Sequence, residues 1–255
     1  AGGSVKILGD KVGLFGSARV DASGDAGGGE ILIGGNYLGK GPEQNATATL
    51  FDSAVSVSAD AINNGDGGRV IVWSDVYTDF RGNISATGGS LGGSGGFVET
   101  SSKDNLQGQG FVTVGSGGLW LIDPRNLTIN DGGADTGNFS GADPNVFTPN
   151  QDTATIDKDS IEAALEGGAD VTITTGGGGS QDGNITVANA ISVDLTAGAS
   201  GGTQTLLLSA DGAININAAI GSSNTNDTFN ITLNSDVDDA NSTGAIDIGA
   251  NIQTQ

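Results

Sequence analysis

The feature that most constrains this chain is a short marker, Gly-Gly-x-aliphatic, that recurs through its first half. The aliphatic residues of successive markers lie 26, 39 and 28 residues apart, and the long step contains an extra stretch near 39–51. Without that stretch the period is close to 26. Self-similarity of this kind is typical of repeat architectures, in which each unit stacks on its neighbours. The markers are Gly2-Gly3-Ser4-Val5, Gly28-Gly29-Glu30-Ile31, Gly67-Gly68-Arg69-Val70 and Gly95-Gly96-Phe97-Val98.

A second marker follows the first in every unit and keeps its phase. It lies 15, 26, 14 and 14 residues behind the aliphatic residue of the first marker, and the value of 26 again includes the extra stretch. Two markers that hold phase through four units indicate a structural repeat. The second markers are Val20-Asp21-Ala22, Val57-Ser58-Ala59, Ile84-Ser85-Ala86 and Val112-Thr113-Val114.

Each repeat contains two or three short runs in which apolar and polar residues alternate, which is typical of strands. Glycines separate the runs, and we expect corners there, with positive φ. No repeat contains a helical crossover, so alternating βαβ folds are excluded. The sequence therefore predicts an all-β parallel β-helix whose coils pair about 4.8 Å apart. We expect Val, Ile, Leu and Ala to point inward and polar residues to point outward.

Residues 131–155 interrupt the repeat with a run rich in Asp, Pro and Gly, which predicts a loop excursion. One short helix is predicted after it, at 157–165. Asp157 or Asp159 can cap its start, Ile161 and Leu165 share one face, and a Gly-Gly pair ends it. We expect this helix to pack against the flank of the β-helix.

Strand patterns resume at Val171 and continue almost to the last residue. We therefore divide the chain into three segments. The first, 1–130, is a β-helix with coils of close to 26 residues; the second, 131–168, is the loop excursion with the short helix; the third, 169–255, continues the β-helix. The last residues carry no capping signal, and Ala1 opens the chain without a signal peptide, so we interpret it as a segment of a larger protein.

The charge balance excludes several classes of partner. The chain has 30 acidic and 9 basic residues, a formal net charge of −21. Such a surface repels nucleic acids and anionic lipids, so we predict no nucleic-acid partner. No apolar run approaches the roughly 18 residues of a membrane span. The chain has no Cys, which excludes disulfides and thiol chemistry.

No set of residues points to catalysis. Parallel β-helices can host polysaccharide lyases and glycosidases. A lyase needs a basic group and a general base, yet the basic residues are scattered and the chain has no His. Nothing singles out a carboxylate pair for glycoside hydrolysis. We therefore predict that the chain is not an enzyme, and we assign no catalytic or cofactor-binding residue.

Calcium is an alternative that the acidic residues leave open. Calcium takes several oxygen ligands from flexible loops. Neither acidic stretch has the spacing of an EF-hand or of the Gly-rich nonapeptide repeat, so solvated turns are the favoured interpretation and we assign no metal ligand. The two stretches contain Asp131, Asp135 and Asp143, and Asp236, Asp238 and Asp239.

Aromatic residues and glycosylation sequons are two further candidates for a binding surface. Trp73 alternates with Val70 and Val72, so its side chain can point outward, where Phe97, Tyr77 and Trp120 would extend a ligand platform. Packing between coils is the favoured interpretation of these rings. Asn-x-Ser/Thr sequons arise by chance in such a composition. They begin at Asn45, Asn83, Asn126, Asn138, Asn184 and Asn230.

The chain resembles the repeat region of filamentous-haemagglutinin-like proteins, the large exoproteins of two-partner secretion systems. The resemblance rests on GGSVKILGDKVGLFGSARVDASGDAGGGEILIGG, GDGGRVIVWSDVYTDFRGNISATGG, GGSGGFVETSSK, LWLIDPRNLTI and IEAALEGGADVTITTGGGGSQDGNITV, and covers most of residues 1–250. It implies a right-handed parallel β-helix (a solenoid), exported by an outer-membrane partner transporter and secreted or held at the bacterial cell surface. The family's N-terminal secretion domain, with its NPNG-type motif, is not found here, so recognition by the transporter is not assigned to these residues.

Two functions follow as hypotheses. The first is a structural stalk or filament segment that serves adhesion or biofilm formation, and whose exposed strand edges allow copies to associate end to end. The second is an adhesin binding module that recognises a glycan or a host or cell-surface protein through the excursions at 39–51 and 131–155, since loops carry function more often than scaffolds do. We favour the structural hypothesis.

Overall fold

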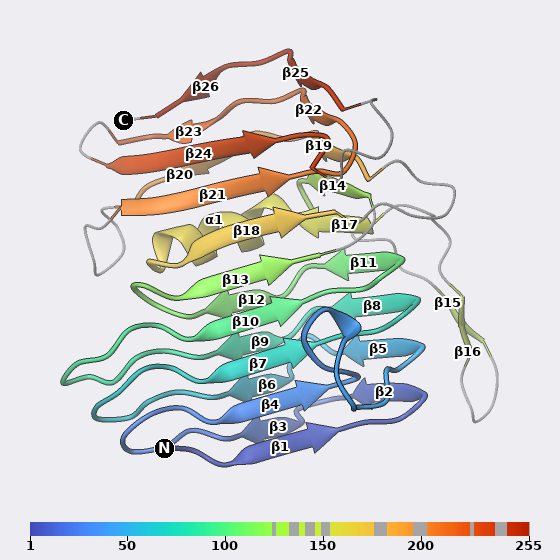
Figure 1. Cartoon of the computed structure of the whole chain (residues 1–255), viewed down its shortest axis with the longest axis vertical. Helices are drawn as coiled ribbons and strands as arrows, with labels where there is room; N and C mark the ends of the chain where they lie inside the picture. The colour runs from blue at the N-terminus through green and yellow to red at the C-terminus, as the bar shows by residue number, and fades with distance from the viewer. Residues whose placement is uncertain are drawn as a thin grey trace.

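The computed structural model describes residues 1–123, 126–132, 154–175, 183–195, 203–224, 227–237 and 244–254, together with the backbone of two strands at 138–140 and 146–148. The chain winds as a right-handed parallel β-helix from the N-terminus at the bottom of Figure 1 to the C-terminus at the top. Each coil passes through three faces. The predicted fold class is therefore confirmed.

The first face is a sheet of eight parallel strands that follow one another in chain order. Val5 pairs with Ile31, Ile31 with Val70, and Val70 with Val98, so the residues of the first marker stack directly on one another. The sheet consists of β1 (Ser4–Ile7), β4 (Glu30–Ile33), β7 (Arg69–Val72), β10 (Phe97–Thr100), β13 (Leu119–Ile122), β18 (Asp170–Thr174), β21 (Thr203–Ser209) and β24 (Thr228–Asn234).

The second face is a sheet of nine parallel strands, one of which is out of chain order. β17 lies between β11 and β14, although it follows β14 in the sequence. In sheet order the strands are β2 (Lys11–Leu14), β5 (Ala48–Phe51), β8 (Tyr77–Phe80), β11 (Asn105–Gly108), β17 (Ala154–Asp157), β14 (Leu127–Asn130), β19 (Ile185–Val187), β22 (Ile214–Ile216) and β25 (Ile246–Ile248). A separate antiparallel pair is formed by β15 (Asn138–Ser140) and β16 (Val146–Thr148).

The third face contains two short parallel sheets with the helix α1 (Lys158–Glu166) between them. Val20, Val57, Ile84 and Val112 pair in succession, so the second marker also stacks in register. The lower sheet consists of β3 (Arg19–Asp21), β6 (Ser56–Ser58), β9 (Asn83–Ser85) and β12 (Phe111–Thr113), and the upper one of β20 (Ile191–Val193), β23 (Ile220–Ser222) and β26 (Ile252–Gln253).

One hydrophobic core fills the interior and runs through all three predicted segments. Val70, Val98, Trp120 and Val171 occupy one inward row of the first sheet and are fully buried. The β-branched and aliphatic side chains suit this narrow interior, because alternate residues of every strand must point into it. The segments at 1–130, 131–168 and 169–255 therefore share a single core.

Except for Gly3, the glycines of the first marker serve close approach between coils, and the positive φ that we expected at corners occurs at other glycines. The glycines in the described residues that have positive φ lie elsewhere. A Cβ on Gly29 would lie 2.1 Å from the carbonyl oxygen of Gly3, and one on Gly68 would lie 2.1 Å from that of Gly29. Arg69 N donates to the same Gly29 oxygen at 2.8 Å. A side chain at these positions would therefore separate two hydrogen-bonded coils.

The predicted helix is confirmed, with Asp157 as its N-cap and Gly167 as its C-cap. Its place differs from the expectation, because α1 contacts both β12 and β20 and so forms part of the third face instead of lying on the flank. Ile161 and Leu165 are fully buried in the main core. Among the helices described here, none is long and apolar enough to cross a membrane.

Candidate functional site: a strap over the first sheet

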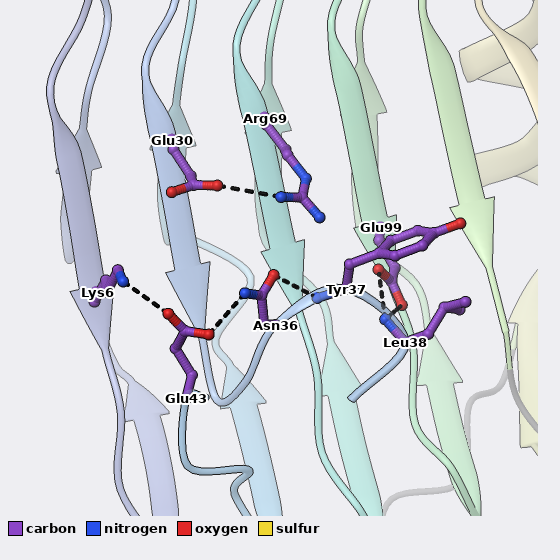
Figure 2. Close-up of polar contacts among 8 residues, drawn as sticks. All are labelled: Lys6, Glu30, Asn36, Tyr37, Leu38, Glu43, Arg69 and Glu99. Carbon is purple, nitrogen blue, oxygen red and sulfur yellow. Dashed lines mark hydrogen bonds and ion pairs between the residues drawn. The ribbon is translucent and has the colours of Figure 1, made fainter. Parts of the chain in front are cut away.

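The strap is the connection between β4 and β5, residues 34–47, and it lies on the outer side of the first sheet. It reaches from β1 to β10 and contains one short 3-10 turn, Tyr37–Gly39 (Figure 2). We expected this excursion at 39–51. The structure corrects those bounds, because residues 48–51 form the regular strand β5, paired with β2 and β8.

The strap covers an apolar strip that faces away from the main core. Leu32 and Ile71 occupy the same outward row of the first sheet, and Trp73 follows at the end of β7. All three are buried, with exposed fractions of 1%, 0% and 5%. Phe97 packs against them at the side. The expectation that aliphatic residues point inward is therefore wrong for Leu32 and Ile71, because the strap supplies a second, external place of burial.

Gly39 of the strap lies directly on the indole ring of Trp73. A Cβ at this position would lie 2.5 Å from the ring, and the backbone has φ +63, a conformation that favours glycine. The indole Nε1 of Trp73 donates to the Asp75 carboxylate at 3.1 Å. Asn45 donates to the same carboxylate at 3.1 Å and to the Gly39 carbonyl at 2.9 Å. The strap and the strip are therefore fitted to each other.

Charged and amide groups hold the strap to the lowest strand, β1. Lys6 Nζ lies 2.7 Å from the Glu43 carboxylate, whose other oxygen accepts from the Asn36 side chain at 2.7 Å (Figure 2). The Asn36 side-chain oxygen in turn accepts from Tyr37 N at 2.7 Å, at the start of the 3-10 turn. The Lys6 ammonium and the Asn36 amide lower the pKa of Glu43 to about 2, so this anchor is ionised at neutral pH.

Glu99 lies beneath the top of the strap and is the most unusual group of the site. Its row partners are Ile71 and Leu121, and its exposed fraction is 0%. Both carboxyl oxygens accept from a single donor, Leu38 N, at 3.2 and 3.3 Å. Burial raises the pKa of Glu99 to about 8, although the hydrogen bonds from Leu38 and Ser101 oppose this shift. Glu99 is therefore largely protonated at neutral pH.

Tyr37 is the aromatic side chain that the strap presents to solvent. Its exposed fraction is 40%. The Arg69 guanidinium lies 5.5 Å from the centre of its ring, and the Phe97 ring meets it edge-on at 5.7 Å. Arg69 also pairs with Glu30 on the neighbouring strand at 3.2 Å. The Tyr37 ring is thus held in one orientation, with one part of its surface open.

Sequence reasoning missed both Glu99 and Tyr37. Glu99 stands in an alternating strand at a position that the pattern assigns to solvent, and only a chain segment from a different coil buries it. Tyr37 lies just before the stretch that we selected as the excursion. The sequence signal that could have located the site is the row itself, because Leu32 and Ile71 are aliphatic at outward positions of two successive repeats.

The acidic candidates that the structure describes, Asp131 and Asp236, do not belong to one group. Asp131 lies beside Asp157 and Asp159, with their carboxylate oxygens within 4.8 Å of one another. Asp157 is occupied as the helix cap, and Lys158 binds Asp159. Calcium requires six or more oxygen ligands, and this group does not provide them by itself. Asp236 does not belong to it, whereas Asp135, Asp143, Asp238 and Asp239 lie outside the described residues.

The four aromatic candidates do not form a ligand platform. Trp120 is fully buried in the main core, where its Nε1 donates to Thr100 Oγ1 at 2.9 Å. Tyr77 is buried on the second face. Trp73 points outward as its alternation indicated, but the strap covers it, with Phe97 beside it. The packing interpretation is therefore confirmed for these rings.

The sequon asparagines lie in different settings. Asn83 and Asn230 are exposed, and Asn45 is bonded inside the strap. Asn126 and Asn184 connect neighbouring coils, because the side-chain oxygen of Asn126 accepts from Asn184 N and that of Asn184 accepts from Ala213 N, each at 2.6 Å. The Asn138 side chain lies outside the described residues. Two of the sequons thus have a structural role as asparagine.

Comparison with known proteins adds no assignment to this site. No protein-family model matches the chain, and no curated protein matches it. Function therefore has to be inferred from the residues and their arrangement.

Proposed function

We propose that this chain is a non-catalytic structural segment, a stalk or filament unit, of a large secreted bacterial surface protein. The observation that carries the proposal is the unbroken stacking of the first sheet, in which eight strands pair in register over a single core. In such a solenoid each coil is stabilised mainly by its neighbours, so the stack can be extended without a change of design. A net charge of −21 keeps the sides of such rods apart.

The state of the acidic groups supports a passive role. A hydrolase of glycosides needs two accessible carboxyl groups on either side of its substrate. Glu99 is covered by the strap, and Asp79, which is almost fully buried on the second sheet, pairs with Arg81 at 2.8 Å. Neither is presented to a substrate. Export through an outer-membrane partner transporter and a place at the cell surface belong to the same proposal and rest on the resemblance to filamentous-haemagglutinin-like proteins.

End-to-end association is part of this proposal. In the top coil, the Ile246 and Ile248 side chains of β25 are 42% and 54% exposed, and in the bottom coil Val5 and Ile7 of β1 are only partly buried. Strand edges with exposed aliphatic side chains favour pairing with a further strand. A neighbouring coil, from the same chain or from another copy, would bury both ends.

A binding module is the second candidate, and Tyr37 is the observation that favours it. An aromatic ring that is held by Arg69 and Phe97 and partly open to solvent suits the apolar face of a sugar ring. The strap would then present the ligand site, while the β-helix would only support it.

Removal of the strap distinguishes the two candidates. Residues 34–47 would be replaced by the short connection that joins β1 to β2, residues 8–10, in the protein displayed on cells. Leu32, Ile71 and Trp73 would be changed to Thr, the residue found at 172 and 232 in the same outward row, so that no apolar strip is uncovered. Far-UV circular dichroism and thermal melting would confirm that the β-helix is retained.

The structural proposal expects unchanged surface display and cell–cell or cell–surface adhesion after this replacement. A loss of adhesion while the β-helix remains folded would overturn it in favour of the binding module. The substitution Tyr37→Ala in the intact strap is the matched control, because it removes the exposed ring alone.

A further inference from the structure

The contact between the strap and Glu99 brings a fully buried carboxyl group under the top of the strap, the part around Leu38. Leu38 N is the strap donor that bonds to both oxygens of Glu99. Leu38 itself has φ +53, a left-handed conformation that is unfavourable for a residue with a side chain. The top of the strap therefore has a strained backbone. It is held by the apolar strip, the ring of Tyr37, the contact with Glu99 and the Asn45 side chain, which links the Gly39 carbonyl to Asp75.

The groups around Glu99 provide little compensation for a negative charge. Arg69 on β7 favours the ionised form, but its guanidinium is shared with Glu30 and the Tyr37 ring. Asp123, after β13, disfavours it, and Lys40 of the strap acts on Asp123. On Glu99's own strand end, the Ser101 hydroxyl is the neighbouring hydrogen-bond partner. A carboxylate here would thus be buried with one backbone N–H, one hydroxyl and a cation that is shared with other groups.

We propose that the strap is a proton-controlled cover, which stays closed over the strip of Leu32, Ile71 and Trp73 while Glu99 is protonated and lifts at its Leu38 end when Glu99 ionises. Opening lets water reach the carboxylate and exposes the apolar strip on the outer side of the first sheet. This device does not depend on whether the chain is a stalk or a binding module.

The direction of the pH dependence follows from linkage. With the strap closed, Glu99 has a pKa of about 8, whereas with the strap open its carboxyl group is in water and its pKa falls toward the ordinary glutamate value of 4.5. The closed state therefore holds the proton in this window and the open state does not. Closure is most favourable below pH 4.5, weakens as the pH rises, and reaches its minimum above pH 8, with a total change in the closed-to-open ratio on the order of a thousandfold.

The other anchor of the strap does not change its charge in this window. The pKa of Glu43 is lowered to about 2 by Lys6 and Asn36, and the pKa of Lys6 is raised by Glu43. This ion pair therefore stays intact while Glu99 titrates. We expect the strap to remain attached to β1 and to open only at the end that covers β7 and β10.

Trp73 is a reporter of the closed strap that the chain already contains. The protein has two Trp residues, and Trp120 is fully buried in the main core. In the variant Trp120→Phe, acrylamide quenching of the remaining fluorescence would be measured from pH 5 to pH 9, with far-UV circular dichroism at each pH. If this variant does not fold, the parent protein serves, because the strap does not cover Trp120.

We expect the quenching constant of Trp73 to increase by about twofold or more between pH 6 and pH 9, while the circular dichroism stays unchanged. The matched variant Glu99→Gln keeps an acceptor for Leu38 N without a titratable group, and its quenching should stay low at every pH. Glu43→Gln weakens the other anchor and should leave the midpoint of the titration in place.

Three results would overturn the proposal. The first is quenching that does not change with pH, and the second is the same increase in Glu99→Gln as in its parent. The third is an increase that accompanies loss of the β-sheet signal, because the β-helix as a whole would then be unfolding.

Discussion

Two interruptions of the repeat, the strap at 34–47 and the segment at 131–168, have opposite effects on the β-helix. The strap leaves a corner, crosses the outside of the first sheet and returns, while β2, β5 and β8 still pair in chain order. The second interruption changes the second sheet and the third face themselves. β17 enters the second sheet out of order, and α1 occupies the third face where a strand would continue the ladder.

The difference teaches what a parallel β-helix requires of an insertion. A helix is about 10 Å wide, which corresponds to about two strand spacings. The second sheet has nine strands against eight in the first, and the out-of-order β17 is the additional one. An insertion at a corner therefore leaves the pairing of the strands unchanged. An insertion that replaces a strand must instead occupy a whole number of strand spacings along the axis of the β-helix.

An insertion in the wall must also replace the hydrogen bonds of the missing strand. The carboxylates of Glu162 and Glu166 on α1 accept from Ser192 N and Asp194 N of the β20 segment, at 2.8 and 2.9 Å. Residues four apart on a helix rise by about 6.0 Å, and alternate amides of a strand are about 6.7 Å apart. Because these distances match, two glutamates on one helix face can replace the carbonyl groups of a strand edge.

The largest effect that separates the two interruptions is expected from their apolar contacts. Leu165→Ala removes a fully buried side chain of the main core and should lower the free energy of unfolding by about 2–5 kcal/mol. Leu32→Ala removes a side chain of equal size beneath the strap. It should affect the strap more than the global transition, as measured by urea denaturation followed by circular dichroism. Equal losses of global stability in Leu165→Ala and Leu32→Ala would contradict the distinction between α1, which is part of the third face, and the strap, which only covers the first sheet.

A smaller effect is expected from the hydrogen bonds between α1 and the β20 segment. The double variant Glu162→Ala with Glu166→Ala leaves Ser192 N and Asp194 N without these acceptors, which should lower stability by about 1–3 kcal/mol in total. Hydrogen exchange of these two amides should become faster. The double Gln variant retains acceptor oxygens and serves as the control; if it behaves like the Ala variant, charge rather than strand replacement is the role of the glutamates.

Gly39→Ala is expected to loosen the strap without unfolding the β-helix. The new Cβ would lie 2.5 Å from the Trp73 ring, and the positive φ alone costs about 1–2 kcal/mol. Fluorescence quenching of Trp73 should increase while the melting temperature of the circular dichroism signal changes little. Gly3→Ala is the matched control, because nothing lies within 4 Å of the added methyl group there. An equal response in both variants would argue against the contact with Trp73.

Loss of the ion pair between Lys6 and Glu43 is expected to have the smallest effect. Lys6→Ala removes a contact of 2.7 Å, but the lysine side chain is 47% exposed and such pairs contribute little. The strap should open slightly more readily at low salt, and added salt should remove the difference between the variant and its parent. Quenching of Trp73 at two ionic strengths measures this; a difference that persists at high salt would show that Lys6 acts through packing.

Several features of the fold could be read from particular residues. Val5, Ile31, Val70 and Val98 were aligned by their Gly-Gly markers and are partners in the first sheet. Gly167 indicated the end of α1 correctly, and Asp157, one of two candidates for the N-cap, is the residue that caps its start, because caps are local features of the backbone. The position of α1 in the third face could not be predicted in this way, since it depends on the packing of α1 between β12 and β20, which come from different coils.

The candidate site was less predictable than the fold. The extra stretch in one repeat is visible in the sequence, but its predicted bounds were wrong. Residues 48–51 belong to β5, and only its pairing with β2 and β8 separates them from the strap. The burial of Glu99 has no signal in its own strand. It results from Leu38, which lies 61 residues earlier and two coils below.

The sequence by itself determined the period of the coil, the stacking of like residues and the start and end of the helix. These depend on local alternation and on glycines that recur at fixed intervals, and each is repeated or capped within a short stretch of chain. Only the tertiary structure decided where the strap lies, which carboxyl group it buries and how α1 replaces a strand. Those features arise from contacts between different coils. The burial of a side chain and the proton affinity of a carboxyl group are therefore properties of the assembled surface rather than of any one segment.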